Sequence, residues 1–176
     1  MEKEDVAYIR SRIREIPDFP KKGVLFRDIA PILKDRRAFS LAIEGMLEMV
    51  KGKRIDYIAG IESRGFIVGA VLANKMNVGF IPIRKKGKLP HEKVQTTYLL
   101  EYGEETIEMQ KDSIERGSNV LIVDDLLATG GTSSAAAQLV ESLGGNVVGF
   151  AFLIELKDLK GREKLKGYEV KSLLAL

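Results

Sequence analysis

The chain has 176 residues, a net charge of +3 and no cysteine. This length fits one domain, and the lack of cysteine excludes disulfides, thiolate metal sites and cysteine nucleophiles. The start, residues 1–5, is charged rather than apolar, and the longest apolar runs, 66–73 and 147–154, are too short to cross a membrane. We therefore expect a soluble protein of the cytoplasm.

The first half of the chain predicts alternating helices and strands. Residues 6–15 indicate an N-terminal helix, which the two prolines after it would end. Apolar residues at helical spacing over 39–50 predict a second, amphipathic helix. A short strand at 56–60 then leads into a largely apolar helix at 63–74 and a further strand at 78–83.

The second half of the chain predicts a hairpin followed by further alternating strands and helices. Residues 94–109 are rich in Thr and Tyr around a glycine turn, which indicates an antiparallel hairpin. Strands are expected at 120–123 and 147–154, with a helix at 132–143 between them, and a short lysine-rich helix and a final strand at 169–174 close the chain. This order predicts a doubly wound, mainly parallel α/β sheet, which binds ligands at the carboxyl ends of its strands.

The segment 120–132 carries the most functional information. Asp124 and Asp125 follow its apolar strand, and a glycine-rich turn then enters a helix. Such a turn presents unpaired N–H groups and the positive end of the helix dipole to a phosphate, while the acids suit sugar hydroxyls. Plain turn chemistry with Thr132 as an N-cap explains the turn alone equally well. The candidate phosphate residues are Ala128, Thr129, Gly130, Gly131 and Thr132.

Three further motifs are ambiguous when each is taken alone. Ser63 and Arg64 start a helix and suit a second anion, although a capped helix with a solvated arginine is the simpler interpretation. Lys88 lies in the basic run 84–88, which is either an anion contact or a solvated loop. Phe26 and the neighbouring Arg27 suit a planar base, but Phe26 fits a core position and Arg27 an ion pair with Asp28.

These motifs together resemble a known family. Segment 120–132 is similar to the ribose-phosphate signature of type I phosphoribosyltransferases, which bind 5-phosphoribosyl-1-pyrophosphate (PRPP). Four other segments resemble the adenine-specific members of that family, the adenine phosphoribosyltransferases: 19–29, 62–66, 84–90 and 100–103. The resemblance implies one type I phosphoribosyltransferase domain over 1–176, with a base-binding hood at 1–35 and a hairpin lid at 84–110.

The resemblance also implies an activity and a role for each candidate residue. The family transfers phosphoribose from PRPP to N9 of adenine, giving AMP and pyrophosphate in purine salvage, and works as a homodimer without nucleic acid or membrane. Mg²⁺ is bound mainly through PRPP, with Asp124 as the candidate direct ligand. By resemblance, Asp124 and Asp125 should bind the ribose and Ala128 to Thr132 should bind the 5′-phosphate. Ser63, Arg64 and Lys88 should bind pyrophosphate. Leu25, Phe26 and Arg27 should bind adenine, and Glu101 should be the catalytic residue.

Two alternatives stay open at the level of sequence. One is a phosphoribosyltransferase for a 6-oxopurine, which shares the PRPP site and differs in the base pocket. The other is a non-catalytic regulator of the same fold that binds nucleic acid. The scattered basic residues disfavour the regulator, because nucleic-acid binding needs a concentrated basic face. Whether Glu101 transfers a proton or orients the base is likewise undecided, and Glu62–Ser63 is a candidate cis peptide.

Overall fold

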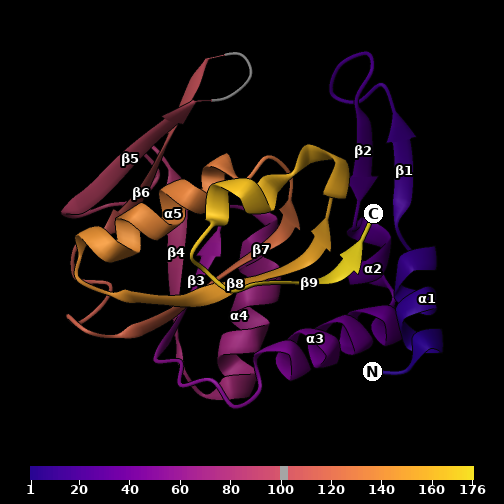
Figure 1. Ribbon diagram of the computed structural model, residues 1–176, viewed down its shortest axis with the longest axis horizontal. Helices are drawn as coiled ribbons and strands as arrows, with labels where there is room; N and C mark the ends of the chain where they lie inside the picture. Colours follow the sequence, from indigo (N-terminus) through magenta and orange to yellow (C-terminus); the bar gives the residue numbers. More distant parts are fainter. Residues whose placement is uncertain (100–102) are drawn as a thin grey trace.

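A computed structural model of the chain describes residues 1–99 and 103–176, and these residues form two sheets. The larger sheet has seven strands in the order β5-β6-β4-β3-β7-β8-β9. Five neighbouring strands, from β4 to the edge strand β9, are parallel, and β6 and β5 continue the sheet in antiparallel pairing beyond β4 (Figure 1). The parallel strands are β3 (Tyr57–Ile61), β4 (Gly79–Lys85), β7 (Asn119–Leu127), β8 (Asn146–Glu155) and β9 (Val170–Ala175).

Helices cover both faces of this sheet, which gives two hydrophobic cores. Alternate residues of a strand point to opposite faces, so Leu121 and Val123 join one core while Val120 and Ile122 join the other. The first core packs under four helices, and the second packs under α5 and the second of two short 3₁₀ turns. The helices are α1 (Lys3–Ser11), α2 (Ala30–Lys34), α3 (Arg36–Val50), α4 (Arg64–Met76) and α5 (Gly131–Ser142), and the turns are η1 (Lys157–Leu159) and η2 (Gly161–Leu165).

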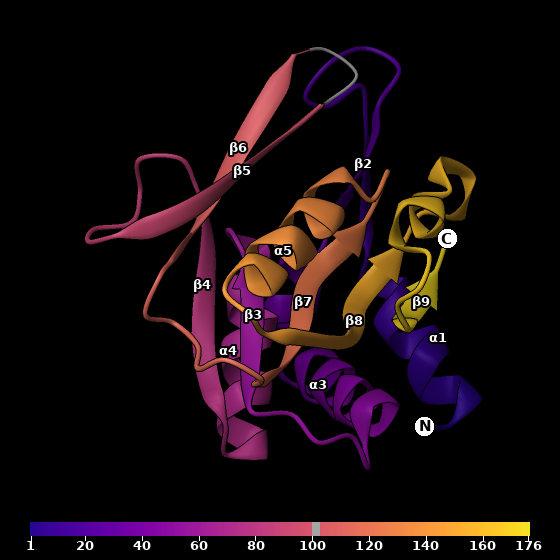
Figure 2. The same ribbon diagram turned by 60° about the vertical axis from the view of Figure 1, so that its left-hand side comes forward.

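Two antiparallel hairpins project beyond the carboxyl ends of the parallel strands. The first consists of β1 (Arg14–Pro17) and β2 (Leu25–Asp28), and the second of β5 (Lys93–Leu99) and β6 (Glu104–Gln110). Figures 1 and 2 show both hairpins rising on the same side of the sheet as the ends of β7 and β8. The second hairpin pairs through β6 with the last two residues of β4 and packs against α5. The fold class expected from the sequence is therefore confirmed.

The structure corrects three of the expected elements. The first helix ends at Ser11 instead of continuing to Glu15, because residues 14–17 pair with β2. Cross-strand ion pairs of Arg14 with Asp28 and of Arg27 with Glu15 stabilise that pairing over the helix. Strand β7 continues through the acid pair to Leu127, since β8 pairs with it over this length. The expected lysine-rich helix is two 3₁₀ turns. No helix in the described part of the chain is long and apolar enough to cross a membrane.

Candidate active site

A cavity of about 560 Å³ opens where the parallel strands end. The first hairpin contributes Phe26 to its wall, and the second contributes Tyr98 and Glu105. The turn between β3 and α4 and the second half of β7 contribute most of the polar groups, so the cavity joins residues far apart in the sequence. The remaining lining residues are Ile61, Glu62, Ser63, Arg64, Ile83, Lys85, Ile107, Asp124, Asp125, Leu126 and Thr132.

The acid pair forms the floor of the cavity. The backbone N–H of Asp125 donates to Asp124 Oδ1 at 2.8 Å, and Arg64 Nε lies 2.9 Å from Asp125 Oδ2. Burial, followed by the charge of Asp125, raises the pKa of Asp124 well above its usual range. Burial also raises the pKa of Asp125, although Arg64 opposes that shift. The pair is therefore costly to keep ionised without a ligand, as is typical of a functional site.

Glycines allow close backbone packing around these acids and the turn that follows. At Gly65, a Cβ would lie 2.7 Å from Asp124 Oδ1, so only glycine lets α4 approach β7 this closely. Gly130 has φ +79°, and a Cβ there would lie 2.3 Å from the carbonyl oxygen of Gly161. Residues 128–132, the phosphate loop, are thus braced from behind by η2. Thr132 is the member of the loop that lines the cavity.

Tyr98 connects the second hairpin to the phosphate loop. The Thr132 hydroxyl donates to the Tyr98 hydroxyl at 2.9 Å, which in turn donates to Glu105 Oε2 at 2.8 Å. Lys85 forms an ion pair with the same carboxylate. Burial, followed by the contacts with Glu105, raises the pKa of Tyr98 to about 12 despite the opposing hydrogen bond from Thr132. The phenol therefore stays protonated and able to donate at neutral pH.

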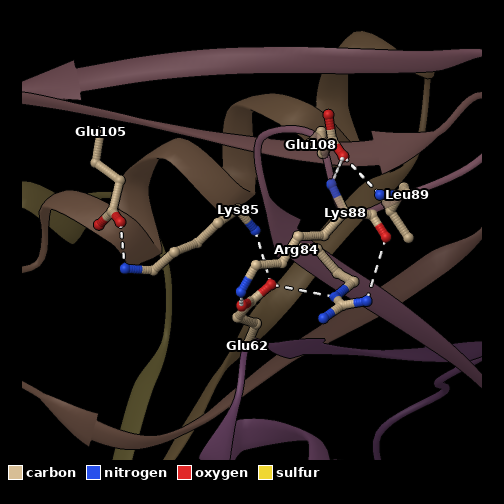
Figure 3. A network of polar contacts seen from close by, with 7 residues as sticks. All are labelled: Glu62, Arg84, Lys85, Lys88, Leu89, Glu105 and Glu108. Atoms are coloured by element: carbon tan, nitrogen blue, oxygen red, sulfur yellow. Dashed lines mark hydrogen bonds and ion pairs between the residues drawn. The ribbon is translucent and has the colours of Figure 1, made fainter.

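The Glu62 carboxylate binds three basic residues at the edge of the cavity. Its Oε2 accepts from Arg84 Nε at 3.1 Å and from the backbone N–H of Lys85 at 2.9 Å, and its Oε1 accepts from Lys88 Nζ at 2.6 Å (Figure 3). Burial would raise the pKa of Glu62, but these donors hold it below its usual range. Lys88 itself does not line the cavity and reaches it through this carboxylate. The Glu62–Ser63 peptide is cis.

The base-binding candidates divide between two sides of the first hairpin. The Phe26 ring lies at 5.1 Å, edge-on, from the Phe19 ring and 5.1 Å below the Arg64 guanidinium, facing the cavity. Arg27 points the other way and pairs with Glu15, because neighbouring strand residues alternate in direction. The expected alternative pairing with Asp28 does not form, since Asp28 pairs with Arg14. Leu25 is exposed at the outer end of β2.

The structure thus brings Phe26, Ser63, Arg64, the acid pair and Thr132 into one cavity. Arg27, Lys88 and the rest of the phosphate loop lie outside its wall, and Glu101 lies outside the described residues. Sequence reasoning missed the side chains of Glu62, Lys85, Tyr98 and Glu105. The period-two pattern of the second hairpin could have placed Tyr98 and Glu105 on its inner face, but their partners depend on register.

The carboxylates of the cavity suit a metal ion that is held mainly by a bound substrate. Within residues 1–99 and 103–176, no three His, Asp or Glu side chains gather as a metal cage. Asp124 and Asp125 supply hard carboxylate oxygens at the cavity floor. Mg²⁺ is commonly bound by one or two carboxylates together with substrate phosphates, so these residues fit a magnesium ion that arrives with a phosphorylated substrate.

Comparison with known proteins identifies the family to which the chain is similar. Residues 32–174 match the phosphoribosyl transferase domain family. The chain is 59% identical to the adenine phosphoribosyltransferase of Halothermothrix orenii over 166 residues, covering 94% of this chain and 98% of that one. The adenine phosphoribosyltransferase structure from Thermoanaerobacter pseudethanolicus is 53% identical, with a TM-score of 0.96 and coverage of 97% and 99%.

A liganded structure is also similar. It is the adenine phosphoribosyltransferase of Saccharomyces cerevisiae complexed with D-2,5-dideoxy-2,5-imino-altritol 1,6-bisphosphate and adenine. That protein is 43% identical to the chain, with a TM-score of 0.92, and the match covers 98% of this chain and 100% of that one.

Proposed function

The chain belongs to the phosphoribosyl transferase family and, within it, to the adenine phosphoribosyltransferases; we propose that its cavity binds PRPP and adenine together and transfers phosphoribose to N9 of adenine. The products are AMP and pyrophosphate. One observation carries the proposal: an acid pair, an arginine and an aromatic ring from separate elements line a single cavity. Those groups match the sugar, the leaving group and the base of this reaction.

We propose that Asp124 and Asp125 hold the ribose hydroxyls and that the phosphate loop holds the 5′-phosphate. The unpaired N–H groups at the start of α5 and the positive end of its dipole favour a dianion there. The raised pKa values of the acids support the assignment, because a ribose donating hydrogen bonds to a carboxylate stabilises its charged form. The glycine packing at Gly65 and Gly130 keeps both groups in place.

Pyrophosphate is assigned to Ser63, Arg64 and Lys88. Its departure leaves positive charge on the ribose, so the reaction needs cations at the leaving group and anions beside the sugar. Arg64 supplies a forked guanidinium next to Asp125, and Lys88 supplies a point charge at the edge marked by Glu62. Asp124 is the candidate protein ligand for a Mg²⁺ ion bound to the substrate, which would supply further positive charge at the leaving group.

Adenine is assigned to the first hairpin. The Phe26 ring offers an apolar face for the base, and the backbone of Leu25 offers groups for the base edge. Arg27 contributes by bracing the hairpin through Glu15. Glu101, by resemblance to the family alone, is the candidate for proton transfer at the purine, where such a group contributes about 10²–10⁴-fold.

The wider organisation is proposed on the same basis. One domain comprises the hood at 1–35, which supplies Phe26, and the lid at 84–110, which supplies Tyr98 and Glu105. A homodimer in the cytoplasm follows from the resemblance to the family, and light scattering on the purified chain tests the dimer.

The direct test is product analysis. Incubation with PRPP, Mg²⁺ and adenine should convert the phosphorus signals of PRPP into those of AMP and pyrophosphate in equal amounts. Hydrolysis to ribose 5-phosphate, with adenine unchanged, would contradict the transfer. Faster conversion of hypoxanthine than of adenine would support the 6-oxopurine alternative.

A further inference from the structure

Lys88 is fixed at three separate points, which is unusual for a lysine in an exposed loop. Its backbone N–H donates to Glu108 Oε1 at 3.0 Å, and its carbonyl accepts from Arg84 Nη1 at 3.2 Å. Its ammonium donates to Glu62 Oε1 at 2.6 Å, as Figure 3 shows. Exposed lysines ordinarily lose side-chain entropy for little gain when held in one geometry. Holding Lys88 in one geometry therefore indicates that the position of its ammonium group is important for function.

Glu108 is the least expected of these partners. It lies in β6 with 0% of its surface exposed. Its Oε1 accepts from the backbone N–H groups of Lys88 and Leu89, the latter at 2.8 Å, while its Oε2 is buried without a hydrogen bond. No ion pair to Glu108 forms within residues 1–99 and 103–176. Burying a carboxylate without an ion-pair contact is costly, so packing alone does not explain why Glu108 stands at this position.

The contacts of Glu108 act on the turn that carries Lys88. Burial opposes its ionisation, yet the N–H groups of Leu89, Gly87 and Lys88 and the charge of Lys93 hold its pKa below the usual range. An ionised carboxylate accepts backbone N–H bonds more strongly than a neutral group does. Glu108 thus fixes the backbone of the turn, and Glu62 fixes the side chain that projects from it.

We propose that Glu108 is a positioning residue for pyrophosphate, which places the Lys88 ammonium at the edge of the cavity by binding the backbone of its turn. This inference rests on the proposed function, in which Lys88 contacts the pyrophosphate. Glu108 touches no substrate and acts through Lys88.

The test compares the binding of two part-substrates. Isothermal titration in the presence of Mg²⁺ measures pyrophosphate, which uses Lys88, and ribose 5-phosphate, which does not. Glu108→Leu should weaken pyrophosphate about tenfold and leave ribose 5-phosphate within twofold. Glu108→Gln, which keeps an acceptor oxygen at the same place, should restore most of the pyrophosphate affinity. Gln110→Leu is the matched control, since it removes another polar side chain of β6 that contacts the segment between β4 and β5, through the Pro90 carbonyl.

A double-mutant cycle separates positioning from general damage. If Glu108 acts through Lys88, adding Glu108→Leu to Lys88→Met should weaken pyrophosphate no further. Additive losses, or unchanged pyrophosphate binding in the Leu variant, would overturn the inference. Should Glu108→Leu fail to fold, Glu108→Asn withdraws the acceptor by one carbon and replaces it in the cycle. Failure of the proposed function gives a different result, because the wild-type chain would then bind neither part-substrate.

Discussion

Arg64 Nε lies 2.9 Å from Asp125 Oδ2, so the cation assigned to pyrophosphate and an acid assigned to ribose are partners of one another. The Asp125 side chain is 6% exposed, whereas the Arg64 side chain is 36% exposed. The pair keeps a buried carboxylate compensated, and its guanidinium remains accessible to an anion. The same ion pair therefore stabilises the fold and contains two groups that we assign to substrate binding.

Arg64→Met should lower both the stability of the fold and the affinity for PRPP. Removing the guanidinium leaves Asp125 buried without its cation, and after allowance for the partly exposed arginine we expect a loss of about 1–3 kcal/mol in the free energy of unfolding. The KM for PRPP should rise because a pyrophosphate contact is lost. Urea unfolding and steady-state kinetics measure the two effects. Arg54→Met is the control, since the Arg54 side chain is 86% exposed and forms only a loose ion pair with Asp56, at 4.0 Å. An equal loss of unfolding free energy in Arg54→Met would contradict the proposed role of Arg64.

Asp124→Asn should stabilise the fold while it weakens PRPP binding. The raised pKa means that the folded chain binds a proton more tightly than the unfolded chain. The wild type therefore loses stability as pH rises from the unfolded pKa toward the folded one, whereas the Asn variant lacks this loss. Unfolding free energies at several pH values from acid to neutral should show the variant's advantage growing with pH. An advantage that does not vary with pH would contradict the assigned cause.

Gly65→Ala should disturb the acid pair from the helix side. The new Cβ would lie 2.7 Å from Asp124 Oδ1 and 3.0 Å from the Val123 carbonyl oxygen, and the latter cannot rotate away. We expect a loss of about 1–3 kcal/mol in stability, as for overpacking elsewhere, together with a raised KM for PRPP. The KM for adenine should change less, because Phe26, to which we assign adenine, belongs to another element. A raised KM for adenine alone would contradict this.

Tyr98→Phe should loosen the second hairpin from α5. The variant removes the hydroxyl that accepts from Thr132 and donates to Glu105. Because the pKa of Tyr98 is raised to about 12, the wild-type phenol keeps the proton that it donates to Glu105 at neutral pH. Hydrogen exchange at neutral pH should show faster exchange of the β5 amides in the variant. Thr97→Val is the control, since the Thr97 hydroxyl contacts Thr106 on the outer face. Equal acceleration in both variants would assign the effect to the hairpin as a whole.

Local sequence rules predicted the acid pair and Thr132, which the structure places in one cavity. Asp124 and Asp125 follow an apolar strand, and the phosphate loop follows them, so strand, turn and helix signals within one short segment sufficed. Sequence reasoning failed where cross-strand register decides. Arg27 faces Glu15 rather than the cavity because β1 replaces the end of the expected helix. Glu108 and Tyr98 owe their partners to long-range packing, which no local pattern encodes.

The most direct test of the central claim is pyrophosphate release, measured with PRPP, Mg²⁺ and one base at a time: adenine, hypoxanthine, guanine, xanthine, uracil or orotate. We expect rapid release with adenine alone, because we assign adenine to Phe26 and the backbone of Leu25, beside the proposed PRPP site. Release with a 6-oxopurine instead would retain the PRPP site and contradict the base pocket. No release with any base, from protein that binds PRPP, would contradict the enzyme and favour the regulator.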